Sequence, residues 1–99
     1  MRIEWHPGAV EDLASLGRPE QERIRKALAE LARLDDARVR LVPYSGALKG
    51  YWKLRVGDVR LVCQVDNRAG RYVLIIHVAH RSVAYGRRGQ RIIVRRGER

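Results

Sequence analysis

Cysteine is nearly absent from this chain, since Cys63 is the single one among 99 residues. An internal disulfide is therefore impossible, and a reducing compartment such as the cytoplasm is favoured. Cys63 alternates with apolar residues and is expected to be a small core residue. The sequence also lacks an apolar run long enough to span a bilayer. Its first ten residues, MRIEWHPGAV, lack the basic-then-apolar order of a signal peptide. We therefore expect a soluble cytoplasmic protein.

Acidic residues are scarce in the second half of the chain. Residues 1–50 hold nine Lys/Arg and eight Asp/Glu, a net charge of +1, whereas residues 51–99 hold twelve and three, a net charge of +9. An excess confined to one half is typical of a polyanion-binding surface, and arginine suits phosphate recognition. Nucleic acid is the first expected partner and an acidic protein segment the second. A membrane surface is third, because no predicted helix combines a basic face with a strongly apolar one.

Residues 51–65, YWKLRVGDVRLVCQV, predict a β-hairpin. A two-residue loop at Gly57-Asp58 places Arg55 opposite Arg60. Side chains alternate between the faces of a strand, so one face is apolar and the other cationic. The cationic face holds Lys53, Arg55 and Arg60 beside Tyr51, Val62 and Gln64. Like charges directly opposite each other destabilise a hairpin, so an anionic ligand is expected there. The alternative is a solvated face that only keeps the sheet soluble.

The first 34 residues predict one strand and two helices. Residues 1–5 alternate and are short enough for an edge strand. Pro7 suits the first position of a helix. We expect His6 to cap this helix and the helix to continue to about Leu16. A second helix begins at Pro19, and its apolar residues recur at three-and-four spacing. The two helices are expected to form an antiparallel pair covering a sheet, because each alone buries too little to be stable.

Residues 72–79, YVLIIHVA, are nearly all apolar and predict a central strand covered on both faces. His77, within this strand, is expected to be a hydrogen-bonded core histidine. The predicted fold is therefore α+β. Two N-terminal helices pack on one face of a small, mainly antiparallel four-stranded sheet, and the cationic face is left open.

The last part of the chain is expected to be a basic tail, residues 86–99, that follows a single domain of residues 1–85. Gly86 and Gly89 disfavour a regular helix there. Residues 91–94, Arg-Ile-Ile-Val, predict a short strand instead. The ends of such a tail are expected to be mobile.

Two segments carry a recognisable pattern: LKGYWKLRVGDVRLVCQVD at residues 48–66 and IIHVAHRSVAY at residues 75–85. In these motifs the chain resembles the RelE/ParE superfamily of bacterial type II toxin–antitoxin systems, and most resembles the RelE-type mRNA interferases. The resemblance implies a RelE-like fold and a ribosome-dependent endoribonuclease that cuts mRNA at the A site, inhibits translation and uses no metal or cofactor. It also implies a hetero-oligomer with a cognate antitoxin, whose acidic segment would cover the cationic face.

The resemblance further implies four catalytic residues. Lys53 matches a strand lysine that contacts the substrate and transfers a proton. Arg60 matches the arginine that holds the scissile phosphate. Arg81 matches an arginine that stabilises the transition state and assists the leaving group. Tyr85 matches a tyrosine that stacks on or orients the attacking nucleotide.

Several further residues are expected to contact RNA. Family members often carry a second lysine two positions before the first, where this chain has Tyr51. Arg55 is expected to substitute for that lysine as a cation but not readily as a base, because arginine stays protonated. His80 adjoins the late arginine and is a candidate for RNA contact or proton transfer. Arg87 and Arg88 are expected to bind phosphates, together with the other tail arginines Arg91, Arg95 and Arg96.

Two other functions stay open. A ParE-like toxin would inhibit DNA gyrase by binding it, without nuclease activity, because one scaffold hosts several functions. An arginine after the glycine turn also occurs in that branch, whereas Lys53, Arg81 and Tyr85 together favour the ribonuclease. The third possibility is a non-catalytic basic module that binds nucleic acid or a protein partner.

Overall fold

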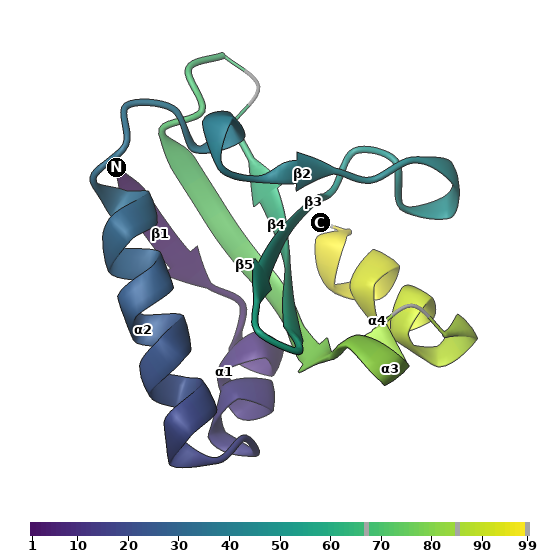
Figure 1. Cartoon of the computed structure of the whole chain (residues 1–99). Helices are drawn as coiled ribbons and strands as arrows, with labels where there is room; N and C mark the ends of the chain where they lie inside the picture. The colour runs from purple at the N-terminus through teal and green to yellow at the C-terminus, as the bar shows by residue number, and fades with distance from the viewer. Residues whose placement is uncertain (67, 85, 99) are drawn as a thin grey trace.

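The computed structural model describes residues 1–66, 68–84 and 86–98, which form a five-stranded sheet with helices on both faces (Figure 1). The elements in chain order are β1 (Arg2–Trp5), α1 (Pro7–Ala14), α2 (Arg18–Ala32), η1 (Ala37–Val39), β2 (Val42–Pro43), η2 (Gly46–Leu48), β3 (Trp52–Val56), β4 (Val59–Val65), β5 (Tyr72–His80), α3 (Arg81–Ala84) and α4 (Arg87–Gly97).

The strand order is β1-β5-β4-β3-β2. The first strand pairs with β5 in parallel, and the other neighbours are antiparallel. The predicted edge position of β1 and central position of β5 are both confirmed. The sheet has one strand more than predicted, because Val42 and Pro43 pair with Lys53 and Trp52. Two paired residues in a Pro-containing loop give no alternating pattern that sequence reasoning could detect.

The β3–β4 hairpin has the predicted register. Arg55 faces Arg60 and Val56 faces Val59, so Gly57 and Asp58 form the two-residue turn. Gly57 has φ +59°, a conformation that glycine adopts without the steric cost that other residues carry. The alternation of the two faces predicted for residues 51–65 is therefore fixed by the turn.

The two N-terminal helices are also confirmed. His6 caps α1, since its Nδ1 accepts a hydrogen bond from the Gly8 amide at 2.9 Å, and Pro7 occupies the first turn. The side chain of Gln21 on α2 joins the pair by donating to the carbonyls of Leu13 and Leu16 at the end of α1. These contacts satisfy carbonyl groups that a helix end would leave unpaired.

One core lies between α1, α2 and the apolar face of the sheet. Its buried members include Ala9 of α1, Ile24 and Leu31 of α2, and Leu54, Leu61, Cys63 and Ile75 of the sheet. Cys63 is fully buried, as predicted. Burial raises the pKa of its thiol to about 12, so the thiol stays protonated.

A second core covers part of the opposite face, which was expected to be open. Ile93 of α4 and Leu48 of η2 pack on Val62, Leu74 and Ile76. That expectation is wrong because Val62 lies among the cations of the hairpin and supplies apolar area that α4 buries. Figure 1 shows α4 on the side of the sheet away from α1 and α2.

The helix α4 replaces the short strand predicted at residues 91–94. Gly86 and Gly89, which were expected to disfavour a helix, did not prevent helix formation. Gly86 precedes it as the N-cap. Gly89 is buried at a close approach, since a Cβ there would lie 2.7 Å from the Ala84 carbonyl oxygen and 2.9 Å from that of Val83. The absence of a side chain at Gly89 allows α4 to pack against α3. Burial of Ile93 outweighs the low helix propensity of glycine.

The prediction that no helix combines a basic face with a strongly apolar one is wrong, because α4 does so. Arginines occupy one side and Ile93 the other, but the apolar side packs on the sheet and is not available to a lipid surface. Within the described ranges, no helix is long and apolar enough to cross a membrane.

Candidate functional site

The cationic residues of the hairpin share one face of the sheet. Lys53 lies opposite Val62, and Arg55 lies opposite Arg60. On the next strand, Ala79 of β5 lies opposite Arg60. The small Ala79 side chain leaves space beside these longer side chains. The structure therefore places Lys53, Arg55 and Arg60 on one face of the hairpin, as the alternation predicts.

Arg60 is buried, with 6% of its surface exposed. Its Nη1 donates to the Gly57 carbonyl at 2.8 Å and to the Val59 carbonyl at 3.2 Å. The guanidinium thus turns back onto the hairpin loop, whereas Arg55 is exposed. The two guanidinium groups therefore lie in different surroundings, although the two residues pair across the hairpin. Arg60 stabilises the turn in this structure, a role that sequence reasoning did not assign to it.

Lys53 is half-buried beside the ring of Tyr44. Its Nζ lies 5.4 Å from the centroid of that ring, within the range of a cation–π interaction. Tyr44 belongs to the loop between β2 and η2. Its position adds an aromatic ring to the cationic face.

Arg81 is held at the hairpin turn by Asp58. The Arg81 amide donates to the Asp58 carbonyl at 2.7 Å, and its Nε lies 3.7 Å from Asp58 Oδ1. The Arg81 side chain is 62% exposed. The start of α3 is therefore fixed to the β3–β4 turn, which places an accessible guanidinium at the end of the sheet where Arg60 lies.

His80 is not on the cationic face. It pairs with Val59, so the register assigns it to the face that carries the α1–α2 core, although at the strand end it is exposed. Its Nδ1 accepts from the Ser82 amide at 3.3 Å and lies 2.9 Å from Ser82 Oγ. His80 therefore caps α3 locally. Tyr85, the fourth predicted catalytic residue, lies outside the described residues.

A cavity of about 500 Å³ connects the end of β5 with the start of α4. Ala79 lines this cavity, and so do Arg87 and Arg88, which are both exposed. Because Ala79 also faces Arg60, the predicted RNA-binding arginines of α4 lie at the border of the cationic hairpin face.

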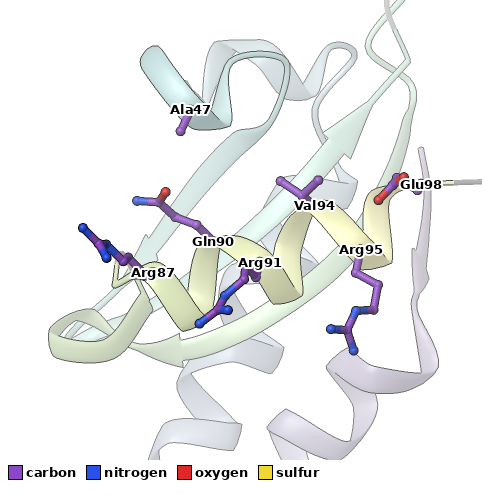
Figure 2. Close-up of a pocket in the computed structure, with 7 residues that line it drawn as sticks. All are labelled: Ala47, Arg87, Gln90, Arg91, Val94, Arg95 and Glu98. Carbon is purple, nitrogen blue, oxygen red and sulfur yellow. The ribbon is translucent and has the colours of Figure 1, made fainter.

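A larger cavity of about 680 Å³ runs between α4 and η2 (Figure 2). The residues that line it are Ala47, Arg87, Gln90, Arg91, Val94, Arg95 and Glu98. Figure 2 shows Val94 and Gln90 projecting toward the side where Ala47 lies, and Arg91 and Arg95 projecting from the other side of α4. Sequence reasoning missed this cavity because it did not predict α4.

A partly buried ionic cluster fixes α4 to the body of the protein. Arg96 Nη1 donates to Asp12 Oδ2 at 2.7 Å and to the Ile76 carbonyl at 2.9 Å. The Val78 amide donates to the same Asp12 oxygen at 3.1 Å, and His77 Nδ1 lies 3.4 Å from it. His77 is thus a hydrogen-bonded core histidine, as predicted, and Arg96 is not a free tail arginine.

The surroundings of Asp12 determine its ionisation. Burial alone would raise the pKa of the carboxyl. Hydrogen bonds from His77, Arg96 and the Val78 amide, with the positive charge of Arg96, instead lower its pKa to about 2. The sequence analysis did not predict a structural role for Asp12. Residues three apart lie on the same side of a helix, so the position of Asp12 relative to the buried Ala9 could have indicated that it faces the protein interior.

Among residues 1–66, 68–84 and 86–98, no group of three or more His, Cys, Asp or Glu side chains is arranged to hold a metal ion. The cationic side chains on the described hairpin face are those of Lys53, Arg55 and Arg60.

Comparison with known proteins places this geometry in a family. A model described as the ParE toxin of the type II toxin-antitoxin system, parDE, matches residues 3–85. No curated protein matches the sequence. The RelBE2 toxin–antitoxin complex of Mycobacterium tuberculosis contains a similar chain, with 28% identity and a TM-score of 0.58 over 82% of this chain and 91% of that one.

Two E. coli toxins share the fold at lower identity. A mutant of RelE in the free state has 22% identity and a TM-score of 0.66, over 98% of this chain and 97% of that chain. YafQ has 15% identity and the same TM-score, over 87% of this chain and all of that one. The family model covers most of the chain and the RelE fold nearly all of it. The chain therefore belongs to the ParE toxin family of type II toxin–antitoxin systems, within the RelE/ParE superfamily.

Proposed function

We propose that this toxin is an endoribonuclease that cuts mRNA at the ribosomal A site without a metal ion and so inhibits translation. The observation that carries the proposal is the position of Lys53, Arg55 and Arg60 on one face of the β3–β4 hairpin, with Arg81 fixed at its turn. Cations held on a rigid sheet stabilise the negative charge that develops on a phosphorane.

The reaction needs a base, cations and an acid. The 2′-hydroxyl of one nucleotide attacks the adjacent 3′ phosphorus, and its proton passes to the base. The bond from phosphorus to the 5′ oxygen of the next nucleotide breaks, and that oxygen takes a proton from the acid. The products are a 2′,3′-cyclic phosphate and a 5′-hydroxyl. Lys53 is the residue of the hairpin face that can exchange a proton, because arginine stays protonated.

The burial of the side chains divides the roles of the arginines. Arg81 and Arg55 are exposed and are the proposed phosphate contacts. Arg60 donates to the turn carbonyls and would act mainly by fixing the hairpin and by its charge. Tyr85 remains the proposed stacking residue, a contact worth roughly 1–3 kcal/mol per base by alanine substitution. Tyr44 beside Lys53 is a second aromatic surface for a nucleotide.

A cognate antitoxin is the proposed partner. Three similar solved structures are RelB–RelE or RelBE2 complexes, from Mycobacterium tuberculosis, Methanococcus jannaschii and Pyrococcus horikoshii. An antitoxin segment rich in Asp and Glu would complement the net charge of +9 on residues 51–99. Co-expression with such a partner is expected to restore growth of cells that produce the toxin.

Primer extension on mRNA from a translation reaction tests the proposal. The wild-type toxin should produce cuts at A-site codons, and Arg81→Ala and Lys53→Ala should each remove most of them. Arg23→Ala is the matched control, since Arg23 is an exposed arginine on α2, across the sheet from the cationic face. Cutting that persists unchanged in both Arg81→Ala and Lys53→Ala would contradict the proposal.

Inhibition of DNA gyrase is the second candidate, and two observations favour it. The matching family model describes the ParE toxin. The Arg60 side chain is buried, whereas the ribonuclease role implied for it requires contact with the scissile phosphate. A supercoiling assay separates the candidates: inhibition of purified gyrase with intact mRNA would establish the ParE-type activity. Absence of both effects would indicate a non-catalytic binding module.

A further inference from the structure

We propose that the outer face of α4 is a docking surface for the phosphate backbone of RNA, separate from the cationic hairpin face. This inference rests on the proposed function only for the identity of the polyanion as RNA. Docking of RNA on this surface does not require cleavage. The surface is named the α4 arginine face and consists of Arg87, Arg88, Arg91 and Arg95.

Helix geometry places these four arginines together. At 100° per residue they fall within an arc of about 100°, on the side opposite the buried Gly89 and Ile93. All four are exposed. Arg87, Arg91 and Arg95 follow one another at about 6 Å along the helix axis, since each residue rises about 1.5 Å. This spacing is comparable with the separation of neighbouring phosphates along a nucleic-acid strand.

The ion pairs among the described residues do not include these charges. Within the described part of the chain, none of the four forms an ion pair with a carboxylate. Pairs of like charge four residues apart, Arg87 with Arg91 and Arg91 with Arg95, destabilise a helix. Arg87 and Arg88 also lie in the first turn, where cations oppose the helix dipole. A polyanion would relieve both effects.

The α4 arginine face is presented by a fixed helix. Ile93 is fully buried, Arg96 is bonded to Asp12, and Gln64 Nε2 donates to the Gly97 carbonyl at 3.1 Å. The helix backbone is therefore already ordered before RNA binds. The loss of affinity that ordering on binding would cause is avoided. The cavity of Figure 2 adjoins the face, and Arg87, Arg91 and Arg95 contribute to its lining.

Other anionic partners fit less well. A membrane surface would need a broad apolar face beside the arginines. Among the described residues, the large apolar side chains exposed beside them are two valines, Val83 and Val94. An acidic protein segment remains the competing outcome. RNA is favoured because Arg87, Arg91 and Arg95 repeat at about 6 Å along the helix axis, which suits the regular spacing of phosphates on a strand. The planar fork of arginine can bind each phosphate with two parallel hydrogen bonds.

The test measures binding of a fluorescent 2′-O-methyl RNA 12-mer by anisotropy. This probe has no free 2′-hydroxyl, so loss of cleavage does not affect the readout. The variant Arg87→Gln/Arg91→Gln/Arg95→Gln should bind at least tenfold more weakly than wild type near 0.1 M salt. Loss of three phosphate contacts should also reduce the slope of log K against log salt by about 2 for a single strand.

The matched control is Arg18→Gln/Arg23→Gln/Arg33→Gln, which removes the same charge from exposed positions in and beside α2. It should retain affinity within about twofold to threefold, because long-range charge alone is screened at this salt. Thermal unfolding verifies that each variant is folded, and the single variant Arg91→Gln, expected to lose about threefold, provides a second measurement.

Equal losses in both triple variants would overturn the proposal, since binding would then follow net charge. It would also be overturned if the α4 variant bound RNA normally but lost affinity for a poly-glutamate peptide, which would assign the face to a protein partner. Normal RNA binding by wild type without mRNA cleavage would contradict the proposed function and leave this inference standing.

Discussion

Arg96 and Asp12 join the two ends of the chain: Arg96 Nη1 on α4 lies 2.7 Å from Asp12 Oδ2 on α1. The side chains are 17% and 21% exposed, so this ion pair is largely withdrawn from solvent. Breaking such a pair leaves one charge buried without compensation, which costs more than the pair itself contributes.

Asp12→Asn is therefore expected to destabilise the protein. A fully buried pair costs about 3–5 kcal/mol when one partner is removed, and partial exposure reduces the expectation here to about 2 kcal/mol. Urea denaturation measures the free energy of unfolding. Glu11→Gln, at the exposed neighbouring position, is the control and should change stability by less than about 0.5 kcal/mol. Equal effects of both substitutions would contradict a specific role for Asp12.

The same carboxylate predicts a loss of stability in acid. The folded-state pKa of Asp12, about 2, lies below its ordinary value of 3.8. Its contribution is therefore present above pH 4 and is lost as the pH falls toward 2, up to about 2 kcal/mol. Several exposed acids titrate in the same range, so the measurement is the difference in unfolding free energy between wild type and Asp12→Asn at pH 5 and pH 2.5. A difference that stays constant between these pH values would contradict the prediction.

Gly89→Ala is expected to destabilise α4 although alanine favours helix. The added Cβ would lie 2.7 Å from the Ala84 carbonyl oxygen, a backbone atom that cannot turn away. The shift that this requires should cost about 1–3 kcal/mol and outweigh a propensity gain of about 1 kcal/mol. Gly86→Ala is the matched control, because no atom lies within 4 Å of a Cβ there, and it should cost at most about 0.5 kcal/mol as a weaker N-cap. A higher melting temperature for Gly89→Ala would refute the close packing of α3 and α4.

Arg60 and Arg81 should respond differently to substitution. Arg60→Ala removes the hydrogen bonds to Gly57 and Val59 and is expected to lower stability by about 1–2 kcal/mol. Arg81→Ala removes an exposed side chain and should change stability by less than about 0.5 kcal/mol. Thermal unfolding and mRNA cleavage, measured on both variants, separate the two roles. If Arg60→Ala were as stable as wild type, its loss of activity would have to come from direct phosphate contact.

The hairpin and the N-terminal helices could be predicted because each is defined by neighbours in the sequence. The Gly57-Asp58 turn fixes a register that the alternating strands then extend, and His6 with Pro7 marks the start of α1. The position of Lys53, Arg55 and Arg60 on one face followed directly from that register.

The helix α4 could not be predicted in the same way. Its glycines disfavour a helix locally, and only the contacts of Ile93 with the sheet and of Arg96 with Asp12 reverse that preference. Residues far apart in sequence decide these contacts. The burial of Arg60 was missed for a similar reason, since its partners are carbonyl groups of the turn itself and leave no signature in the side-chain pattern.

The parallel pairing of β1 with β5 has a consequence for how the chain folds during synthesis. Arg2 pairs with Tyr72, so the first strand has no parallel partner until the residues of β5 have been synthesised. The ion pair between Asp12 and Arg96 depends on a residue still further along the chain. The attachment of α4 to α1 through this pair therefore follows synthesis of all five strands of the sheet.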